Sequence, residues 1–249
     1  MMISSGIGKS KKNFERGSKM ANFVLVHGSW AGGWQWRDIR EKLENEGHRV
    51  LTPSLTGMSD RHHLINENVG LHTHIEDIAR LIEWEDLNDV VLVGHSYGGM
   101  VITGAAARIK NRLSHLVYVD AFLPRAGECA WDLLPWQPEI FETLRLKDKP
   151  WQVEPVDKMT YFPELADYDM DRSTPMTIRT HSDKLPEATT EVAGTYIECT
   201  QEPSFFGEVA KRAIEDGMQH ISIEAGHYVI ITHSDDVVKV LKEAAGIKA

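Results

Sequence analysis

The sequence contains few cysteines and no long apolar run, and both shortages narrow the class of protein. Its two cysteines, Cys129 and Cys199, are too few for a disulfide framework, and no CxxC pair suggests a metal site. No segment approaches the roughly 20 apolar residues of a membrane-spanning helix. The basic residues near the start precede no apolar stretch of the kind that a secretory signal contains. We therefore expect a soluble, cytoplasmic protein that binds no metal.

Positive charge is also in short supply. The chain has 27 Lys and Arg against 37 Asp and Glu, which gives a formal net charge of -10. Nucleic acids and anionic membranes would repel such a protein, so we do not expect either as a partner. The acidity is sufficiently explained by solubility. The oligomeric state stays open, a homodimer included.

Short apolar runs alternate along the sequence with segments of helical period. This alternation predicts an α/β fold with a mainly parallel central sheet flanked by helices. One helix is expected behind a capping box of Thr73 and Glu76, and the last helix is expected to begin near Ser234 as its N-cap. Residues 1–20, which end at Met20, are interpreted as a disordered tail, an upstream start or an expression remnant. The expected strands are 23–26, 49–52, 90–93, 116–119, 195–199 and 220–224.

Residues 123–185 interrupt this alternation with many prolines and with Trp131, Trp136 and Trp151. A structureless loop of this length is improbable inside a compact domain. We therefore expect a cap insertion of short helices over the carboxyl edge of a core formed by 21–122 and 186–249. The cap's aromatic residues either line an apolar pocket or form a small core of their own. Trp131, together with Trp30 from the core, is a candidate for substrate contact.

A candidate nucleophile follows the apolar run 90–93. The run leads into a G-x-S-x-G motif, and the small and apolar residues after it suit a buried helix. A serine on such a sharp turn is strained and needs glycine neighbours, while the helix N-terminus favours developing negative charge. Ser96 is therefore predicted to be the nucleophile, the alternative being a Gly-rich turn with a solvent-exposed serine. The motif reads Gly94-His95-Ser96-Tyr97-Gly98-Gly99.

A second motif, His27-Gly28-Ser29-Trp30, directly follows the first expected strand. Acyl transfer needs two preorganised N–H donors directed at the oxyanion of the tetrahedral intermediate. Tyr97, the residue after the nucleophile, is expected to supply one donor, and Ser29 the other. The alternative is a glycine-rich loop that only turns the chain.

The expected base is His227, because it lies after the last expected strand and before the last helix, where hydrolases of this chain order carry their histidine. Two carboxylates compete for the third catalytic position. Asp120 ends the strand 116–119 and would be costly to bury without a partner, and it is the favoured acid. Glu202 lies in a polar loop past the next strand and is the alternative acid.

Together these residues resemble the α/β-hydrolase superfamily, and within it the branch of plant methylesterases, hydroxynitrile lyases and their bacterial esterase relatives. The resemblance spans roughly residues 23 to 241 and implies an eight-stranded core, a cap, no cofactor, and small esters or cyanohydrins as substrates. It is carried by His27-Gly28-Ser29-Trp30 with Trp34, Thr52-Pro53 with Gly57, the Ser96 motif, and Gly226-His227.

The sequence also departs from that branch. Its plant members carry an Asp acid at the position of Glu202 and typically an Ala at the position of Asp120, so the resemblance leaves the acid open. Its lyases have a Thr one residue after the first-strand His and a Lys right after the catalytic His. This chain has Gly28 and Tyr228 there.

The leading hypothesis is a serine esterase that hydrolyses a small hydrophobic or aromatic carboxylic ester through an acyl-enzyme, without a cofactor. Three alternatives remain at this stage. They are a hydroxynitrile lyase, a cofactor-free dioxygenase of the same fold that uses an acid after the sixth strand, and a ligand receptor that turns over slowly.

Overall fold

The computed structural model describes residues 20–166, 168 and 172–247, so the tail expected at 1–20 lies outside the described residues except for Met20. Six strands form one fully parallel sheet in the order β2-β1-β3-β4-β7-β8. Each expected strand is present within a few residues of its predicted position. They are β1 Asn22–Val26, β2 Arg49–Leu51, β3 Val90–His95, β4 Leu113–Val119, β7 Gly194–Cys199 and β8 Gln219–Ile223.

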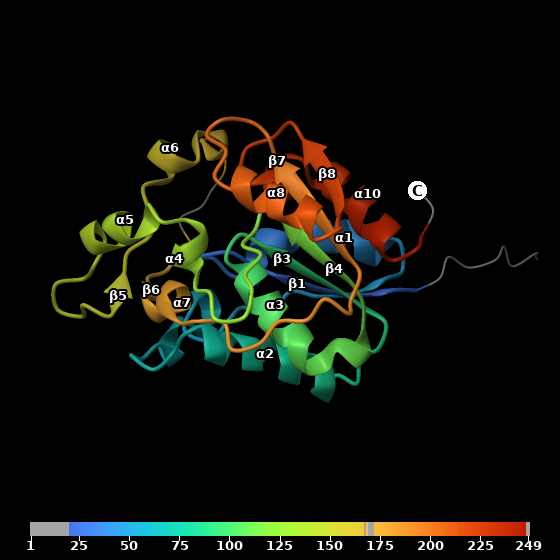
Figure 1. Ribbon diagram of the computed structural model, residues 1–249, viewed down its shortest axis with the longest axis horizontal. Coiled ribbons are helices and arrows are strands. Elements are labelled where there is room, and N and C mark those ends of the chain that lie inside the picture. The colour runs from blue at the N-terminus through green and yellow to red at the C-terminus, as the bar shows by residue number, and fades with distance from the viewer. Residues whose placement is uncertain (1–19, 167, 169–171, 248–249) are drawn as a thin grey trace, which may run out of the picture.

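The central strands of the sheet are buried on both faces, and strand alternation distributes their side chains between two cores. In β1, Val24 and Val26 pack into one core, and Phe23 and Leu25 pack into the other. Helices α2 (Leu71–Trp84), α3 (Gly98–Ile109) and α8 (Gly207–Glu215) cover the first core. Helices α1 (Arg37–Asn45) and α10 (Ser234–Ala244) cover the second, and Figure 1 shows them across the sheet from α2. The resemblance implied eight strands, whereas six form this sheet among the described residues.

Both predicted helix caps are wrong. Helix α2 begins at Leu71 after Gly70 and has no side-chain cap, so Thr73 lies inside its first turn. Ser234 is the first residue of α10 rather than its N-cap. Its hydroxyl accepts a hydrogen bond from Lys42 Nζ at 2.8 Å and donates one to Asp38, so it joins α10 to α1 instead of capping α10.

Residues 123–185, hereafter the cap segment, contribute no strand to the main sheet among their described residues. They form short elements at one side of the core (Figure 1). These are α4 Ala130–Leu133, α5 Gln137–Thr143, β5 Gln152–Val153, α6 Lys158–Tyr161, η4 Pro163–Leu165, β6 Met176–Thr177 and α7 Arg179–Ser182. Strands β5 and β6 pair with each other in an antiparallel ladder.

The remaining short helices are η1 Gly33–Trp36, η2 Ser59–Leu64, η3 Lys110–Arg112 and α9 Val229–Thr232. In the part of the chain that the structure describes, no helix combines the length and the apolar character needed to cross a membrane.

Candidate active site

Ser96 lies on the sharp turn between β3 and α3, with φ at +54°. A non-glycine residue in this left-handed conformation is strained, and such strain concentrates at functional sites. The turn also needs glycines on both sides. A Cβ on Gly94 would come within 2.6 Å of the Gly98 backbone, and one on Gly99 within 2.0 Å of the carbonyl oxygen of Phe122. Only a chain without these side chains lets α3 approach the sheet closely enough to form the turn.

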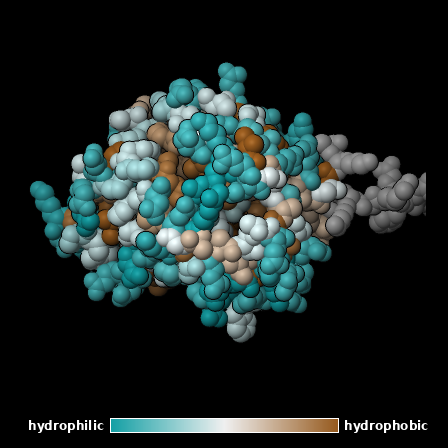
Figure 2. Space-filling model, in the orientation of Figure 1, coloured by the Kyte–Doolittle hydropathy of each residue, from teal (hydrophilic) through white to brown (hydrophobic). Residues whose placement is uncertain are grey.

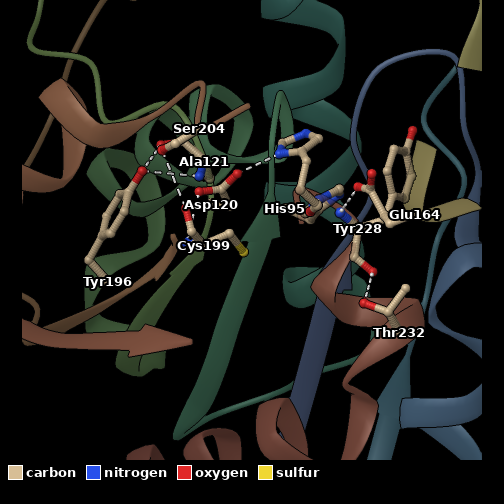
Figure 3. Close-up of polar contacts among 10 residues, drawn as sticks. His95, Asp120, Ala121, Glu164, Tyr196, Cys199, Ser204, Tyr228 and Thr232 are labelled. Atoms are coloured by element: carbon tan, nitrogen blue, oxygen red, sulfur yellow. Dashed lines mark hydrogen bonds and ion pairs between the residues drawn. The ribbon is translucent and has the colours of Figure 1, made fainter. Parts of the chain in front are cut away.

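His227 lies between β8 and α9, where its imidazole meets Asp120 at the end of β4. The distance from His227 Nδ1 to Asp120 Oδ2 is 2.6 Å, and both side chains are buried. Asp120 itself has φ at +42°, and its second oxygen, Oδ1, accepts the backbone N–H of Cys199 at 3.2 Å. Figure 3 shows this carboxylate between Cys199 and the imidazole to which it is joined. Both carboxylate oxygens therefore have a partner, as a buried charge requires.

Glu202, the alternative acid, does not reach this arrangement. It is exposed, and its Oε2 accepts the backbone N–H of Ser204 at 3.0 Å within its own loop. The structure therefore brings Asp120, and not Glu202, to His227.

Two further residues support the loop that carries His227, and the sequence analysis assigned neither of them this role. His95 Nε2 donates to the carbonyl oxygen of His227 at 2.9 Å. Burial, and after it the neighbouring His227, hold the pKa of His95 well below its usual value. From the cap segment, Glu164 Oε1 accepts the backbone N–H of Tyr228 at 3.2 Å, and Figure 3 shows these two residues side by side. The loop is therefore held from the core and from the cap segment at once.

Ser96 and His227 line the same cavity. Its free volume is about 60 Å³, compared with roughly 10–15 Å³ for one water on the same measure. The core contributes Gly28, Ser29 and Trp30 to its wall, and the cap segment contributes mostly apolar residues. On the face shown in Figure 2, hydrophobic side chains gather between the cap segment and α8 in a mostly hydrophilic surface. The apolar lining comprises Leu134, Trp136, Ile140, Phe141, Val156, Tyr161, Phe162, Phe205 and Phe206.

Of the two tryptophans predicted to contact substrate, only Trp30 lines the cavity. Trp131 is not part of the lining and packs edge-on against Phe141, with ring centroids 6.0 Å apart and planes at 85°. Trp136 lines the cavity instead. The structure therefore places Trp131 behind Phe141 and outside the lining, because the sequence does not show which face of a short helix is turned inward.

The two residues expected to donate to an oxyanion flank Ser96. Tyr97 follows it directly and is fully buried at the start of α3. Ser29 lines the cavity, and the chain before it passes so close to the turn that a Cβ on Gly28 would lie 3.0 Å from the Cβ of Ser96. The loop after β1 is therefore packed against the nucleophile turn.

The chain is similar to known esterases over part of its length. A carbendazim hydrolyzing esterase from Nocardioides sp. (strain SG-4G) is 60% identical over 116 residues, which are 47% of this chain and 48% of that protein. Methylesterase 8 of Arabidopsis thaliana is 35% identical over 104 residues, covering 41% of this chain and 38% of the relative. The matched part is thus less than half of either relative.

Among solved structures, an extracellular alpha/beta-hydrolase from a Paenibacillus species superimposes with a TM-score of 0.74. The superposition covers 90% of this chain and 98% of that one at 24% identity, and it shows a shared fold. The family model of the alpha/beta hydrolase family matches residues 23–240, nearly the whole described chain. The protein therefore belongs to the alpha/beta hydrolase family.

Proposed function

We propose that the protein is a serine esterase that hydrolyses small hydrophobic or aromatic carboxylic esters. The observation that carries this proposal is the 2.6 Å hydrogen bond between His227 and the buried carboxylate of Asp120, in a cavity that His227 shares with Ser96 on its strained turn. Nucleophile, acid and base then follow in the chain order Ser, Asp, His that is typical of this fold.

In the proposed mechanism, Ser96 Oγ attacks the ester carbonyl carbon while His227 Nε2 takes its proton. Asp120 holds the proton of His227 on Nδ1, which leaves Nε2 free as the base, and it stabilises the imidazolium that forms. The backbone N–H groups of Ser29 and Tyr97 bind the oxyanion. His227 then protonates the leaving alcohol, and a water molecule activated by the same imidazole hydrolyses the acyl-enzyme and restores Ser96.

The substrate class follows from the cavity wall. Aromatic and aliphatic side chains dominate it, and Gln137 is among the few polar side chains outside the proposed catalytic groups. An apolar acyl or alkoxy group gains free energy there by leaving water, whereas a charged one loses its hydration. Carbendazim, for which one relative is named, belongs in the substrate panel beside aryl acetates.

The test combines p-nitrophenyl esters, carbendazim and a fluorophosphonate probe with the variant Ser96→Ala. We expect Ser96→Ala to lose covalent labelling and ester turnover while its circular dichroism stays that of the wild type. Ser114→Ala is the matched control, since Ser114 is an exposed residue of β4 whose hydroxyl bonds only to the carbonyl oxygen of Asp89 at 3.1 Å. Labelling of Ser96→Ala at the wild-type level would refute the proposal.

A further inference from the structure

One buried histidine near the site has no part in the mechanism above. His181 lies in α7, at the end of the cap segment, and is 1% exposed. Its ring stacks on Tyr97, with centroids 5.1 Å apart and planes at 19°. Phe122 meets the ring edge-on at 5.7 Å, and Phe141 packs against it at 4.7 Å. An aromatic cage therefore fixes the position of this imidazole.

The hydrogen bonds around His181 also fix its protonation. Thr180 Oγ1 lies 2.8 Å from the carbonyl oxygen of Thr177 and 3.7 Å from Met176 Sδ, which can only accept, so its single proton is directed to these acceptors. His181 Nδ1, 2.8 Å from the same hydroxyl, must therefore be the donor to Thr180 Oγ1. That leaves Nε2 unprotonated, and it accepts the hydroxyl of Ser29 at 3.3 Å.

The imidazole of His181 is neutral at neutral pH and in mildly acidic solution. Burial lowers the pKa of His181 to about 3. The lone pair on Nε2 is therefore available to Ser29 in neutral and in mildly acidic solution, and the ring does not compete with His227 for a proton.

We propose that His181 is a positioning residue that holds both N–H donors of the oxyanion site, Ser29 through a hydrogen bond and Tyr97 through ring stacking. This inference rests on the proposed function, because it concerns the donors named there. Donors that are already in place when the oxyanion forms cost no reorganisation during the reaction. The cap segment thereby contributes to catalysis through its final short helix as well as through the cavity wall.

Tyr97 is held from the opposite side as well, which makes the stack on His181 part of a clamp. His74, fully buried in α2, lies 2.9 Å from the carbonyl oxygen of Thr56 through Nε2, so Nε2 carries the proton. His74 Nδ1 then accepts the hydroxyl of Tyr97 at 2.8 Å. Tyr97 is therefore held at both ends, with its hydroxyl bound to His74 and its ring face on His181.

Three single variants and one double variant separate the hydrogen bond from the ring stack. His181→Phe keeps an aromatic ring against Tyr97 but removes the acceptor, and Ser29→Ala removes the donor while keeping its backbone N–H. We expect each to lower kcat for an aryl acetate about ten-fold with KM within about three-fold, since small misplacements of catalytic groups cost up to about a hundred-fold. The double variant should be no slower than either single one. His181→Gln, whose Oε1 can accept the Ser29 hydroxyl, should retain more of kcat than His181→Phe.

Hydrogen–deuterium exchange of residues 27–33 gives a readout that does not need turnover. We expect faster exchange in His181→Phe and Ser29→Ala than in the wild type, with His181→Gln between them. An unchanged kcat and unchanged exchange in His181→Phe, or fully additive losses in the double variant, would overturn the inference and leave the esterase proposal intact. A wild type without turnover or labelling would instead refute the esterase proposal, and the exchange data would still decide whether His181 anchors Ser29.

Discussion

At the scale of single residues, the choice between two carboxylates depends on burial. Asp120 is 2% exposed and has a partner for each oxygen, whereas Glu202 is exposed and bonds within its loop. A buried carboxylate interacts with an imidazolium far more strongly than an exposed one, because little water screens the pair. The position of Asp120 therefore suits the stabilisation of positive charge on His227 during acyl transfer.

The first prediction compares the two acids directly. Asp120→Asn should lower kcat by about 10⁴, since an amide cannot hold the proton of His227 on Nδ1 as the carboxylate does. Glu202→Gln should leave kcat within about two-fold, because an exposed surface carboxylate with local partners has little effect on the site. Steady-state kinetics on one aryl acetate, with circular dichroism of each variant, make the comparison. The opposite ranking of the two losses would assign the acid to Glu202.

A second prediction concerns cyanohydrins. Cleavage releases cyanide, and the lyases that this chain resembles place a Lys ammonium after the catalytic histidine. Here Tyr228 occupies that position, and a phenol carries a positive charge in neither of its protonation states. Burial raises its pKa to about 12, so it stays a neutral hydrogen-bond donor. Gly28 offers no hydroxyl, and any side chain there would crowd Ser96. We expect kcat/KM for mandelonitrile cleavage to fall far below that for an aryl acetate measured on the same preparation. Equal or faster cyanohydrin cleavage would make the protein a lyase.

At the scale of elements, the nucleophile turn depends on how closely α3 approaches the chain after β4. The backbone N–H of Phe122 donates to the carbonyl oxygen of Ser96 at 3.1 Å, which joins the two segments directly. Gly99 lies at the same contact. A Cβ at this position would meet the backbone oxygen of Phe122, which cannot move aside as a flexible side chain could. The packing of α3 and the turn at Ser96 therefore both require that position 99 carry no side chain.

From this contact we predict the effect of Gly99→Ala. The added Cβ must displace either α3 or the loop after β4, so the free energy of unfolding should fall by about 1–3 kcal/mol, and kcat should fall with it. Gly207→Ala at the start of α8 is the matched control, because its Cβ would meet nothing closer than 3.8 Å. Urea unfolding and ester kinetics on both variants test the pair. A Gly99→Ala variant as stable and active as Gly207→Ala would show that the close approach is not required.

The elements also show what could be predicted from the sequence. The strands were recognisable because a parallel strand buried on both faces is a continuous apolar run, as β3 is. Ser96 and His227 follow strand ends, so chain order indicated them. Chain order allowed Glu202 as well as Asp120, and only the cost of burying Asp120 without a partner favoured it. The start of the last helix near Ser234 is confirmed, but the N-cap role of Ser234 was wrong, because its hydroxyl contacts α1 instead. The role of His181 could not be predicted, since it lies in an irregular segment. No sequence pattern there indicates that its side chain folds back against Tyr97 and Ser29.

At the scale of the whole molecule, the described core encloses several histidines that are kept neutral. His27 is fully buried, and its Nε2 accepts the backbone N–H of Leu55 at 3.0 Å, so Nδ1 carries the proton and donates to the carbonyl oxygen of Gly28 at 2.8 Å. Burial lowers the pKa of His27 to about 4, and that of His181 to about 3. Each ring thus stabilises a loop of the site only while it is uncharged.

This burial predicts how stability depends on pH. In the unfolded chain both rings take up a proton near the ordinary histidine pKa of about 6.5, whereas in the folded protein they do so only near 4 and 3. Their contribution is therefore complete above about pH 6.5 and is lost as the pH falls towards the folded values, because the unfolded state binds more protons throughout that window.

In that window each ring should lower the free energy of unfolding by about 1.4 kcal/mol for every unit by which the pH falls. Urea unfolding at several pH values between 7.5 and 4.5 should show little change for the wild type above about pH 6.5 and a steady decline below it. His181→Phe and His181→Gln both remove one titrating ring, so both should decline less steeply by about 1.4 kcal/mol per pH unit, although their kcat values differ. Wild-type slopes in both variants would mean that His181 is not kept neutral by burial.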